Sequence, residues 1–326
     1  MRSGWNVALA AAPVVLAAVV FFALWYAADR GVPYDVALVL LPAFLIELAL
    51  YLGACVDRTR EKLEELRPAT IALLVTVTAP VSYLAYTIPA GTASLLNVTA
   101  ILALAATASF WYLIAGRRTG ADAGFVLLLA VPVLLRAFDV LYPDVVPRLP
   151  MQTLGAVMWY RTALLAILVL RRLEGVGFGL IPRRREWAIG FRNFLWFMPI
   201  GLAGALAVGF VQLRDVRLEP RTFLLMAATF LGVLWILAVA EEFFFRGVIQ
   251  QFLSRLLGSD RAGLVIASVI FGLAHLGYRE FPNWRFALLA TVAGVFYGRA
   301  YLQAQSIRAA MVTHALVVTV WKTFLT

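Results

Sequence analysis

Five polar residues interrupt the apolar C-terminal part of the sequence and carry side chains suited to hydrolysis. Glu241 and Glu242 are adjacent, and Arg246 follows within LGVLWILAVAEEFFFRGVIQQFL. The chain has two histidines, His275 at the end of VIASVIFGLAH and His314 within AAMVTHALVVTVW. Carboxylates and imidazoles are common general acids and bases in enzymes. A charge at mid-bilayer costs about 3 kcal/mol on insertion scales, so charges in such apolar segments require a reason.

Helical geometry predicts different roles for the two carboxylates. Glu242 and Arg246 are four residues apart, so they lie on one face of a helix and can pair. Glu241 points about 140° away from Arg246 on the same helix. We therefore predict that Arg246 neutralises Glu242 and that Glu241 remains free for another partner. The structural alternative, a buried pair with Glu241 reaching back to the membrane interface, explains Glu241 poorly.

A free intramembrane glutamate and two histidines permit two kinds of hydrolysis. In the first, Glu241 takes a proton from water, and an imidazole holds the water or stabilises the oxyanion. In the second, two histidines and one glutamate bind zinc. No HExxH motif is present, so the metal-free version is favoured and no cofactor is predicted. Zinc stays open as the alternative, with ligands from separate helices.

The composition predicts that these residues lie in a membrane. Of 326 residues, 63% are hydrophobic and 14% are charged, and the mean hydropathy is +0.88. Soluble proteins carry about 25% charged residues, so a water-soluble enzyme is excluded. The single cysteine, Cys55, excludes an internal disulfide. The net charge of +10 comes from arginines in short runs between apolar segments, which is typical of cytoplasmic loops rather than of nucleic-acid binding.

The apolar runs predict an all-α, polytopic membrane helical bundle with about eleven transmembrane segments, since each crossing needs roughly 20 apolar residues. Strand-like alternation is absent, which leaves helices as the spanning elements. The predicted segments are Trp5 to Ala28 and residues 35–56, 69–89, 94–115, 122–142, 151–171, 191–212, 222–245, 262–277, 284–303 and 308–325.

Basic loops predict the orientation and the domain boundary. Three loops that should share one side are rich in arginine and lysine, so that side and the N-terminus should be cytoplasmic. Arginine far outnumbers lysine, which favours a prokaryotic cytoplasmic (inner) membrane. The last of these loops separates an N-terminal six-helix membrane domain of unknown role, residues 1–186, from a second domain, residues 187–326. The segment Glu186 to Phe197 either lies along the interface or begins the next crossing. The basic residues are Arg58, Arg60, Lys62, Arg67, Arg117, Arg118, Arg171, Arg172, Arg183, Arg184 and Arg185.

The N-terminal part also carries intramembrane charges. Arg136 and Asp139 are three residues apart, which predicts an ion pair on one helical face. Glu47 and Arg161 are candidates for a second pair, although sequence spacing alone cannot bring them together. For Arg136 and Asp139, a structural pair that locks helices together is favoured over a ligand site.

Three motifs in the C-terminal part resemble those of a known family. EEFFFR at 241–246 resembles the EExxxR motif of the CAAX prenyl protease type II family, also called the CAAX protease and bacteriocin-processing (CPBP) family. FGLAH at 271–275 resembles the FxxxH motif of this family, and HALVV at 314–318 lies where its HxxxN or HxxxD motif belongs. The resemblance covers roughly residues 220–325 and makes the domain at 187–326 CAAX-protease-like.

The resemblance implies an intramembrane endopeptidase of the glutamic type. Its substrate would be a lipid-modified or membrane-tethered protein or peptide, processed as in CAAX cleavage or the removal of a C-terminal sorting tag. By position, Glu241 is the base, His275 is its partner and His314 stabilises the oxyanion. Glu242 and Arg246 support the site.

One residue departs from the family pattern. Val318 stands where the family has Asn or Asp, and its side chain cannot donate a hydrogen bond. Losing one oxyanion donor can cost about 10²–10³ in rate. Thr313, Tyr278 and Asn283 are candidates to replace it. The alternative is a catalytically inactive family member that acts in binding, immunity or scaffolding. A transporter is disfavoured because no internal repeat is present.

Overall fold

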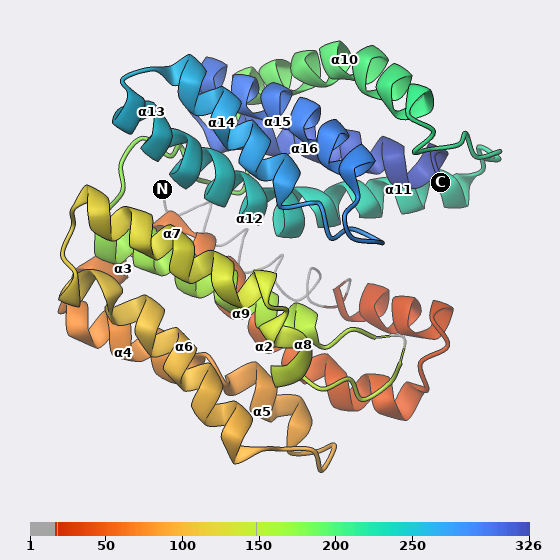
Figure 1. Ribbon diagram of the computed structural model, residues 1–326. Helices are drawn as coiled ribbons and strands as arrows, with labels where there is room; N and C mark the ends of the chain where they lie inside the picture. Colours follow the sequence, from red (N-terminus) through yellow and green to blue (C-terminus); the bar gives the residue numbers. More distant parts are fainter. Residues whose placement is uncertain (1–16, 18, 148) are drawn as a thin grey trace, which may run out of the picture. The chain divides into compact units, whose positions relative to one another are not determined.

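The computed structural model describes residues 17, 19–147 and 149–326. The described residues are helical apart from connecting segments and one isolated bridge between Leu213 and Leu325. The chain divides into two compact units, Met1–Arg171 and Arg172–Thr326. Most of the first predicted segment, Trp5 to Ala28, lies outside the described residues. Figure 1 shows unit 1 in red to yellow-green and unit 2 in green to blue.

Unit 1 is a bundle of apolar helices. Ser94 caps helix α6 by accepting a hydrogen bond from the Asn97 backbone N–H. Pro80 separates α4 from α5, because proline lacks the N–H that a continuous helix needs. The helices are α2 (Tyr34–Cys55), α3 (Asp57–Glu64), α4 (Pro68–Thr78), α5 (Val81–Thr87), α6 (Leu95–Ile114), α7 (Thr119–Leu134), α8 (Ala137–Leu141) and α9 (Gln152–Leu165), which continues as the π-helix η1 (Ala166–Arg171).

The two ion pairs considered for unit 1 are both present, in different settings. Arg161 Nε lies 3.0 Å from Glu47 Oε1, and both side chains are buried. Arg136 donates from Nε to Asp139 Oδ2 at 2.8 Å, but this pair is solvent-accessible. The prediction that Arg136 and Asp139 lie on one helical face was wrong. Arg136 has φ of 53°, a left-handed conformation between α7 and α8, so the pair joins the residue that precedes α8 to the first turn of that helix.

Unit 2 begins with a long helix and continues with an unbroken helical run. The run continues twelve residues beyond the predicted end at 245, because the residue that ends it is Gly258 at φ of 63°. The elements are α10 (Arg184–Ala207), α11 (Pro220–Gly232), η2 (Val233–Ala238), α12 (Val239–Glu242), η3 (Phe243–Gln250), α13 (Gln251–Leu257), α14 (Asp260–Leu273), α15 (Trp284–Ala304) and α16 (Ile307–Phe324).

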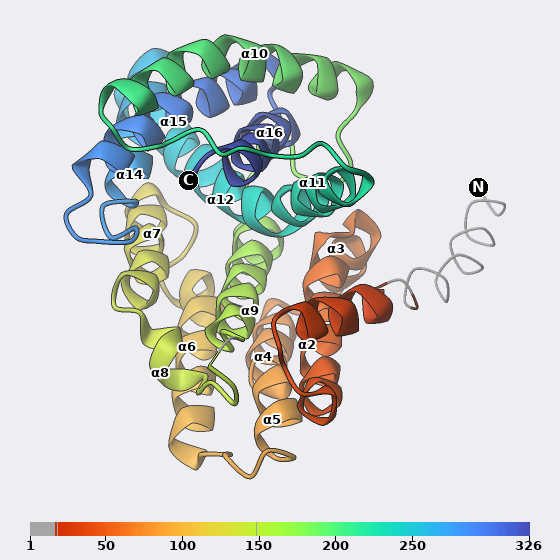
Figure 2. The ribbon, with the colours of Figure 1, turned by 90° about the vertical axis from the view of Figure 1, so that its right-hand side faces the viewer.

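Helix α16 is the centre of unit 2. It packs against α10, α15 and the run from α11 to α12, and Figure 2 shows these helices around it. Its residues from Ala309 to Ala315 are all buried, as expected for a helix covered on every side. Gly190 of α10 permits the close approach, because a Cβ there would lie 2.6 Å from Val312 Cβ.

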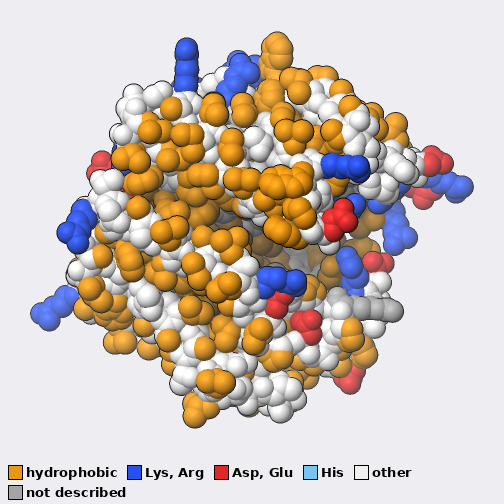
Figure 3. Space-filling model, in the orientation of Figure 1, with side chains coloured by type: hydrophobic (Ala, Val, Ile, Leu, Met, Phe, Trp, Pro, Cys, Tyr) orange, Lys and Arg blue, Asp and Glu red, His pale blue; other side chains and the backbone are white. Residues whose placement is uncertain are grey.

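The chain is an integral, polytopic membrane protein. Among the described residues, six helices are long and apolar enough to cross a bilayer, and hydrophobic side chains cover much of the face in Figure 3. The predicted number of about eleven stays a prediction. Residues 186–197 form the first half of the continuous helix α10 rather than a separate segment. The six helices are Tyr34–Cys55, Pro68–Thr87, Leu95–Ile114, Gln152–Arg171, Arg184–Ala207 and Pro220–Leu257.

Candidate active site

The paired glutamates lie between two stretches of π-helix. Helix α12 contains Glu241 and Glu242, with η2 before it and η3 after it. A π-turn bonds residue i to i+5, is rare, and often occurs at functional sites. The sequence predicted an ordinary α-helix here, because π-turns have no composition signal that separates them from apolar α-helix.

Glu242 is the centre of a buried charged network. Its Oε2 lies 3.2 Å from Arg246 Nε, and its Oε1 lies 2.7 Å from His314 Nδ1. All three side chains are at most 4% exposed. The carboxylate paired with Arg246 is an acceptor, so His314 donates its Nδ1–H, which fixes the ring orientation. The pairing of Glu242 with Arg246 is as the helical spacing predicts.

Arg246 is held by neighbours that the sequence analysis did not include. Its Nη2 donates to the Gly294 carbonyl at 3.0 Å, and its guanidinium lies 4.5 Å from the centre of the Phe271 ring. One turn along α15, Gln250 Nε2 donates to the Gly298 carbonyl at 3.3 Å. The two glycines have no side chain to block this approach: a Cβ at Gly294 would lie 3.3 Å from Arg246 Nη2.

Glu241 has a carboxylate oxygen without a hydrogen-bond partner among the described residues. Its side chain is 19% exposed, whereas its Oε2 atom is buried and has no hydrogen-bond partner among the residues that the structure describes. Oε2 lies 3.9 Å from His314 Nε2, beyond hydrogen-bonding distance. A buried polar atom without a partner is costly and is unusual in folded proteins. Glu241 therefore has hydrogen-bonding capacity that its described neighbours do not use.

His275 presents one ring nitrogen to the site and has the other engaged. It follows α14, and its Nδ1 lies 2.7 Å from the carbonyl oxygen of Phe271. A carbonyl can only accept, so we infer that Nδ1 carries the proton. In the neutral ring, Nε2 then has a free lone pair that can accept a hydrogen bond from water. The Phe271 ring packs on the imidazole with ring centres 4.6 Å apart.

His314 is stacked on a tyrosine. The Tyr297 ring lies 4.6 Å from the imidazole centre at an interplanar angle of 14°. Phe271 approaches the same imidazole edge-on at 6.1 Å. Together with the bond to Glu242, these rings leave the imidazole little freedom to rotate, so Nε2 stays on the side of Glu241.

One cavity brings the three predicted reactive side chains together. It has a volume of about 780 Å³, and Glu241, His275 and His314 all contribute to its wall. Glu242 and Arg246 lie behind this wall and hold His314. The remaining lining is mostly apolar and comes from α10, α15 and α16. Three cationic residues also line the cavity: Arg214, Arg279 and Lys322.

The cavity distinguishes among the three candidates for the missing oxyanion donor. Val318 lines it, as a residue in the family Asn position should. Thr313 instead donates to the Gly190 carbonyl at 3.0 Å, away from the cavity. Asn283 caps α15 and donates to the Tyr278 carbonyl at 2.9 Å. Tyr278 is the candidate whose side chain contributes to the cavity wall.

Within the described part of the chain, no group of three or more His, Cys, Asp and Glu side chains is arranged to hold a metal ion. The choice between metal-free and zinc-dependent hydrolysis stays a prediction from the sequence.

Several residues of the site were missed by sequence reasoning. Tyr297 has no charge or motif to distinguish it from other aromatics in an apolar helix. Gly294 and Gly298 did carry a signal, since glycines four residues apart in a membrane helix indicate close helix packing. The cationic residues of the cavity lie in or next to loops that are remote from one another in sequence, so only the fold brings them together.

The geometry defines a membrane-embedded site with a glutamate and two histidines, and comparison with known proteins gives its family. Residues 222–320 match the family model described as "Type II CAAX prenyl endopeptidase Rce1-like". This part of the chain is similar to the Rce1-like family, and the resemblance found in the sequence is confirmed. The family is a family of proteases that act on membrane-associated substrates. No curated protein and no solved structure matches the chain.

Proposed function

We propose that the Rce1-like domain is an intramembrane endopeptidase that hydrolyses a peptide bond close to the membrane with water activated by Glu241. The observation that carries the proposal is that Glu241, whose Oε2 has no hydrogen-bond partner among the described residues, lines a cavity together with His275 and His314. A buried carboxylate with an open acceptor position, next to two imidazoles, suits a general base.

Each reactive group that lines the cavity has a defined role in the proposed reaction. A water molecule bonds to Glu241 and to Nε2 of His275, and the carboxylate takes one of its protons as the water oxygen attacks the carbonyl carbon. The negative charge on the carbonyl oxygen is stabilised by His314, which requires a proton on Nε2, and by the Tyr278 hydroxyl. The C–N bond then breaks, and the proton held by Glu241 passes to the leaving amine.

The cavity lining supports a substrate that is apolar and ends in a carboxylate. Most lining side chains are hydrophobic, which suits a lipid-modified or membrane-tethered segment. Arg214, Arg279 and Lys322 supply positive charge to the same cavity. A free C-terminus would pair with them, so we propose processing close to the C-terminus, as in CAAX-type cleavage or the removal of a sorting tag.

We also propose the location of the protein from its loops. The basic loops favour a prokaryotic cytoplasmic membrane with the N-terminus on the cytoplasmic side. The second candidate function is that of an inactive family member in binding, immunity or scaffolding. Val318 in the cavity wall favours this candidate, because a valine supplies no oxyanion donor.

The test compares cleavage of tethered peptides by the full chain in lipid nanodiscs. The substrates are lipidated peptides with either a free or an amidated C-terminus. We expect Glu241→Gln and His275→Ala each to lower kcat/KM by at least about 10², since general acid–base groups contribute 10²–10⁴. Amidation should raise KM. Glu174→Gln, an exposed glutamate outside the cavity, is the matched control and should retain activity.

Two results would overturn the proposal. Wild-type activity in both Glu241→Gln and His275→Ala would exclude this site as the catalytic one. If no peptide is cleaved by the wild-type chain and Glu241→Gln leaves the cellular phenotype unchanged, the inactive family member is the better description.

A further inference from the structure

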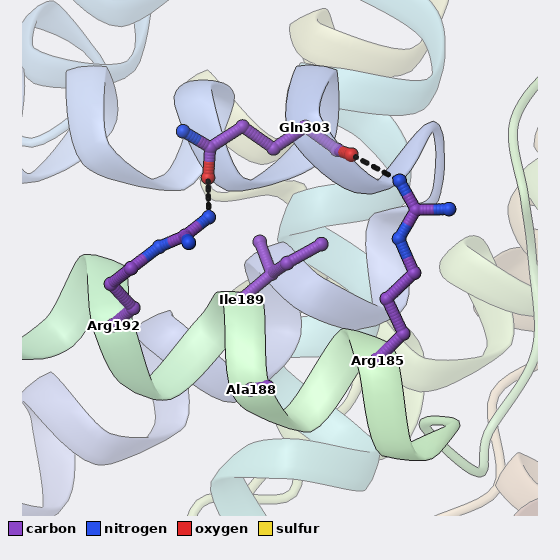
Figure 4. A pocket seen from close by; sticks show the side chains of 5 residues that line it. All are labelled: Arg185, Ala188, Ile189, Arg192 and Gln303. Carbon is purple, nitrogen blue, oxygen red and sulfur yellow. Dashed lines mark hydrogen bonds between the residues drawn. The ribbon is translucent and has the colours of Figure 1, made fainter.

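A second cavity in unit 2 has the chemistry of an anion site. It has a volume of about 450 Å³ and is formed where the first turns of α10 face the end of α15. Its lining consists of Arg185, Ala188, Ile189, Arg192 and Gln303. Figure 4 shows the two arginines reaching toward Gln303 from either side of the Ile189 side chain. None of these residues lines the cavity of Glu241.

Among the described residues, the two guanidinium groups have no anionic partner. Arg192 Nη2 donates to Gln303 Oε1 at 3.2 Å, and Arg185 Nη2 donates to the Gln303 carbonyl at 3.5 Å. Across the described residues, no carboxylate forms an ion pair with either arginine. Gln303 Oε1 also accepts from Asn193 Nδ2 at 3.0 Å, so the acceptors of Gln303 are already engaged. Each guanidinium has five N–H donors, and most of them remain available to an added anion.

A neighbouring arginine at the start of α10 is paired with a carboxylate instead. Arg308 forms a pair with Glu186, with Nη2 2.7 Å from Oε1, at the start of the same helix α10. Arg185, the residue before Glu186, does not share this carboxylate. The two cavity arginines are seven residues apart on α10, which places them on one face about two turns from each other. Bidentate arginines at this spacing suit a phosphate group.

The surface that continues from the cavity is apolar and exposed. Trp196 lies one turn beyond Arg192 and is 58% exposed, and Ile200 one turn further is 52% exposed. Helix α10 is itself one of the six candidate membrane spans. A ligand with a phosphate at the arginines can therefore lay hydrocarbon along the rest of the helix. A free phosphate would use the arginines alone and leave this apolar strip without a role.

We propose that this cavity binds the phosphate headgroup of an anionic phospholipid, with the acyl chains along the exposed face of α10. The headgroup is held by Arg185 and Arg192. The bound lipid bridges α10 and α15, both of which also line the cavity of Glu241. This assignment does not rest on the proposed protease function, because its test measures lipid binding without any substrate.

The test uses the full chain in detergent, titrated with phosphatidylglycerol or phosphatidylcholine and followed by native mass spectrometry. We expect tighter binding of phosphatidylglycerol by the wild-type chain. Each basic residue near an anionic headgroup contributes about fivefold, so Arg185→Gln and Arg192→Gln should each weaken phosphatidylglycerol binding by about that factor, and the double variant by about 25-fold. Arg192→Lys should retain most of the affinity. Binding of phosphatidylcholine should not change.

Arg184→Gln is the matched control. It removes the same charge from the adjacent, exposed position, outside the cavity, and should leave the affinity within about twofold of wild type. An equal loss in Arg184→Gln would overturn the proposal, since binding would then follow net charge. Equal affinity for both lipids in the wild-type chain would also overturn it. Full competition by millimolar inorganic phosphate would assign the cavity to the free anion instead of the lipid.

Discussion

Each unit of this protein buries a glutamate–arginine pair, and the two pairs differ in what surrounds them. In unit 1, Glu47 accepts from Arg161 at 3.0 Å and from Ser82 Oγ at 2.8 Å, so each carboxylate oxygen has a partner. The guanidinium of Arg161 also donates to the side chain and the carbonyl of Thr78. Both carboxylate oxygens of Glu47 are therefore satisfied, which is typical of a structural contact.

In unit 2, the corresponding pair is Glu242 and Arg246, and it contacts a residue that lines a cavity. Glu242 holds both Arg246 and His314, and the adjacent Glu241 has an oxygen without a hydrogen-bond partner in the described structure. The difference shows that a charge buried in a membrane helix does not by itself indicate a site. Unused hydrogen-bonding capacity in a residue that lines a cavity is the feature that distinguishes the surroundings of the unit 2 pair from those of the unit 1 pair.

The largest predicted effects come from breaking either pair. Removing one partner of a buried ion pair costs about 3–5 kcal/mol, because the other charge is left uncompensated. We therefore expect Arg161→Met and Arg246→Met each to lower the free energy of unfolding by that amount, measured by denaturant titration in micelles. Replacing both partners, in Glu47→Gln/Arg161→Met and Glu242→Gln/Arg246→Met, should recover most of the loss.

Measurements of peptide cleavage by the two double variants then distinguish the roles of the two pairs. The unit 1 double variant should cleave at the wild-type rate, because its residues do not line the cavity. The unit 2 double variant should stay impaired although it is stable, since His314 no longer has a carboxylate to orient it. Equal activity in the two double variants would contradict the distinction between the pairs.

The second prediction concerns the oxyanion donor. If the Tyr278 hydroxyl replaces the family Asn, Tyr278→Phe should lower kcat by about 10²–10³ with little change in stability, since the side chain is 43% exposed. Val318→Asn in the Tyr278→Phe background should restore part of the rate. Thr313→Val is the control, because that hydroxyl bonds the Gly190 carbonyl. A wild-type kcat in Tyr278→Phe would remove this tyrosine from the mechanism.

The sequence predicted which polar side chains form the candidate site, and the reasons are physical. Two acidic residues and an arginine within a largely apolar helical run are expensive in a bilayer, so their presence alone indicates a role. Helical spacing separated Glu242, the paired acid, from Glu241. The fold class followed from hydropathy, because membrane helices must satisfy their backbone hydrogen bonds internally.

What the sequence did not predict depends on contacts between remote segments. Nothing in the run around Arg136 marks a left-handed residue, so the helix break there was missed. Tyr297 is one aromatic among many until α15 places it against His314. Hydropathy also placed the end of the helical run in unit 2 at residue 245 instead of Gly258. The charged residues Glu241, Glu242 and Arg246 lower the hydropathy there, as they would at the end of a membrane crossing.

The smallest predicted effects test how closely the helices must pack to aim His275. A Cβ at Gly272 of α14 would lie 1.9 Å from Thr291 Oγ1 and 2.5 Å from the Ala287 carbonyl of α15. Overpacking of this kind costs about 1–3 kcal/mol. We expect Gly272→Ala to lower the free energy of unfolding by that amount and to lower kcat as well, because α14 carries the turn on which His275 lies.

Two further glycines make this a comparison between the units. At Gly155 in unit 1, a Cβ would lie 2.7 Å from the Tyr142 ring, so Gly155→Ala should cost similar stability but leave kcat unchanged. At Gly277, two residues after His275, a Cβ would meet nothing within 4 Å, and Gly277→Ala should change neither quantity. If kcat falls as much in Gly155→Ala as in Gly272→Ala, the loss follows stability in general, and the packing of α14 on α15 has no special role in positioning the histidine.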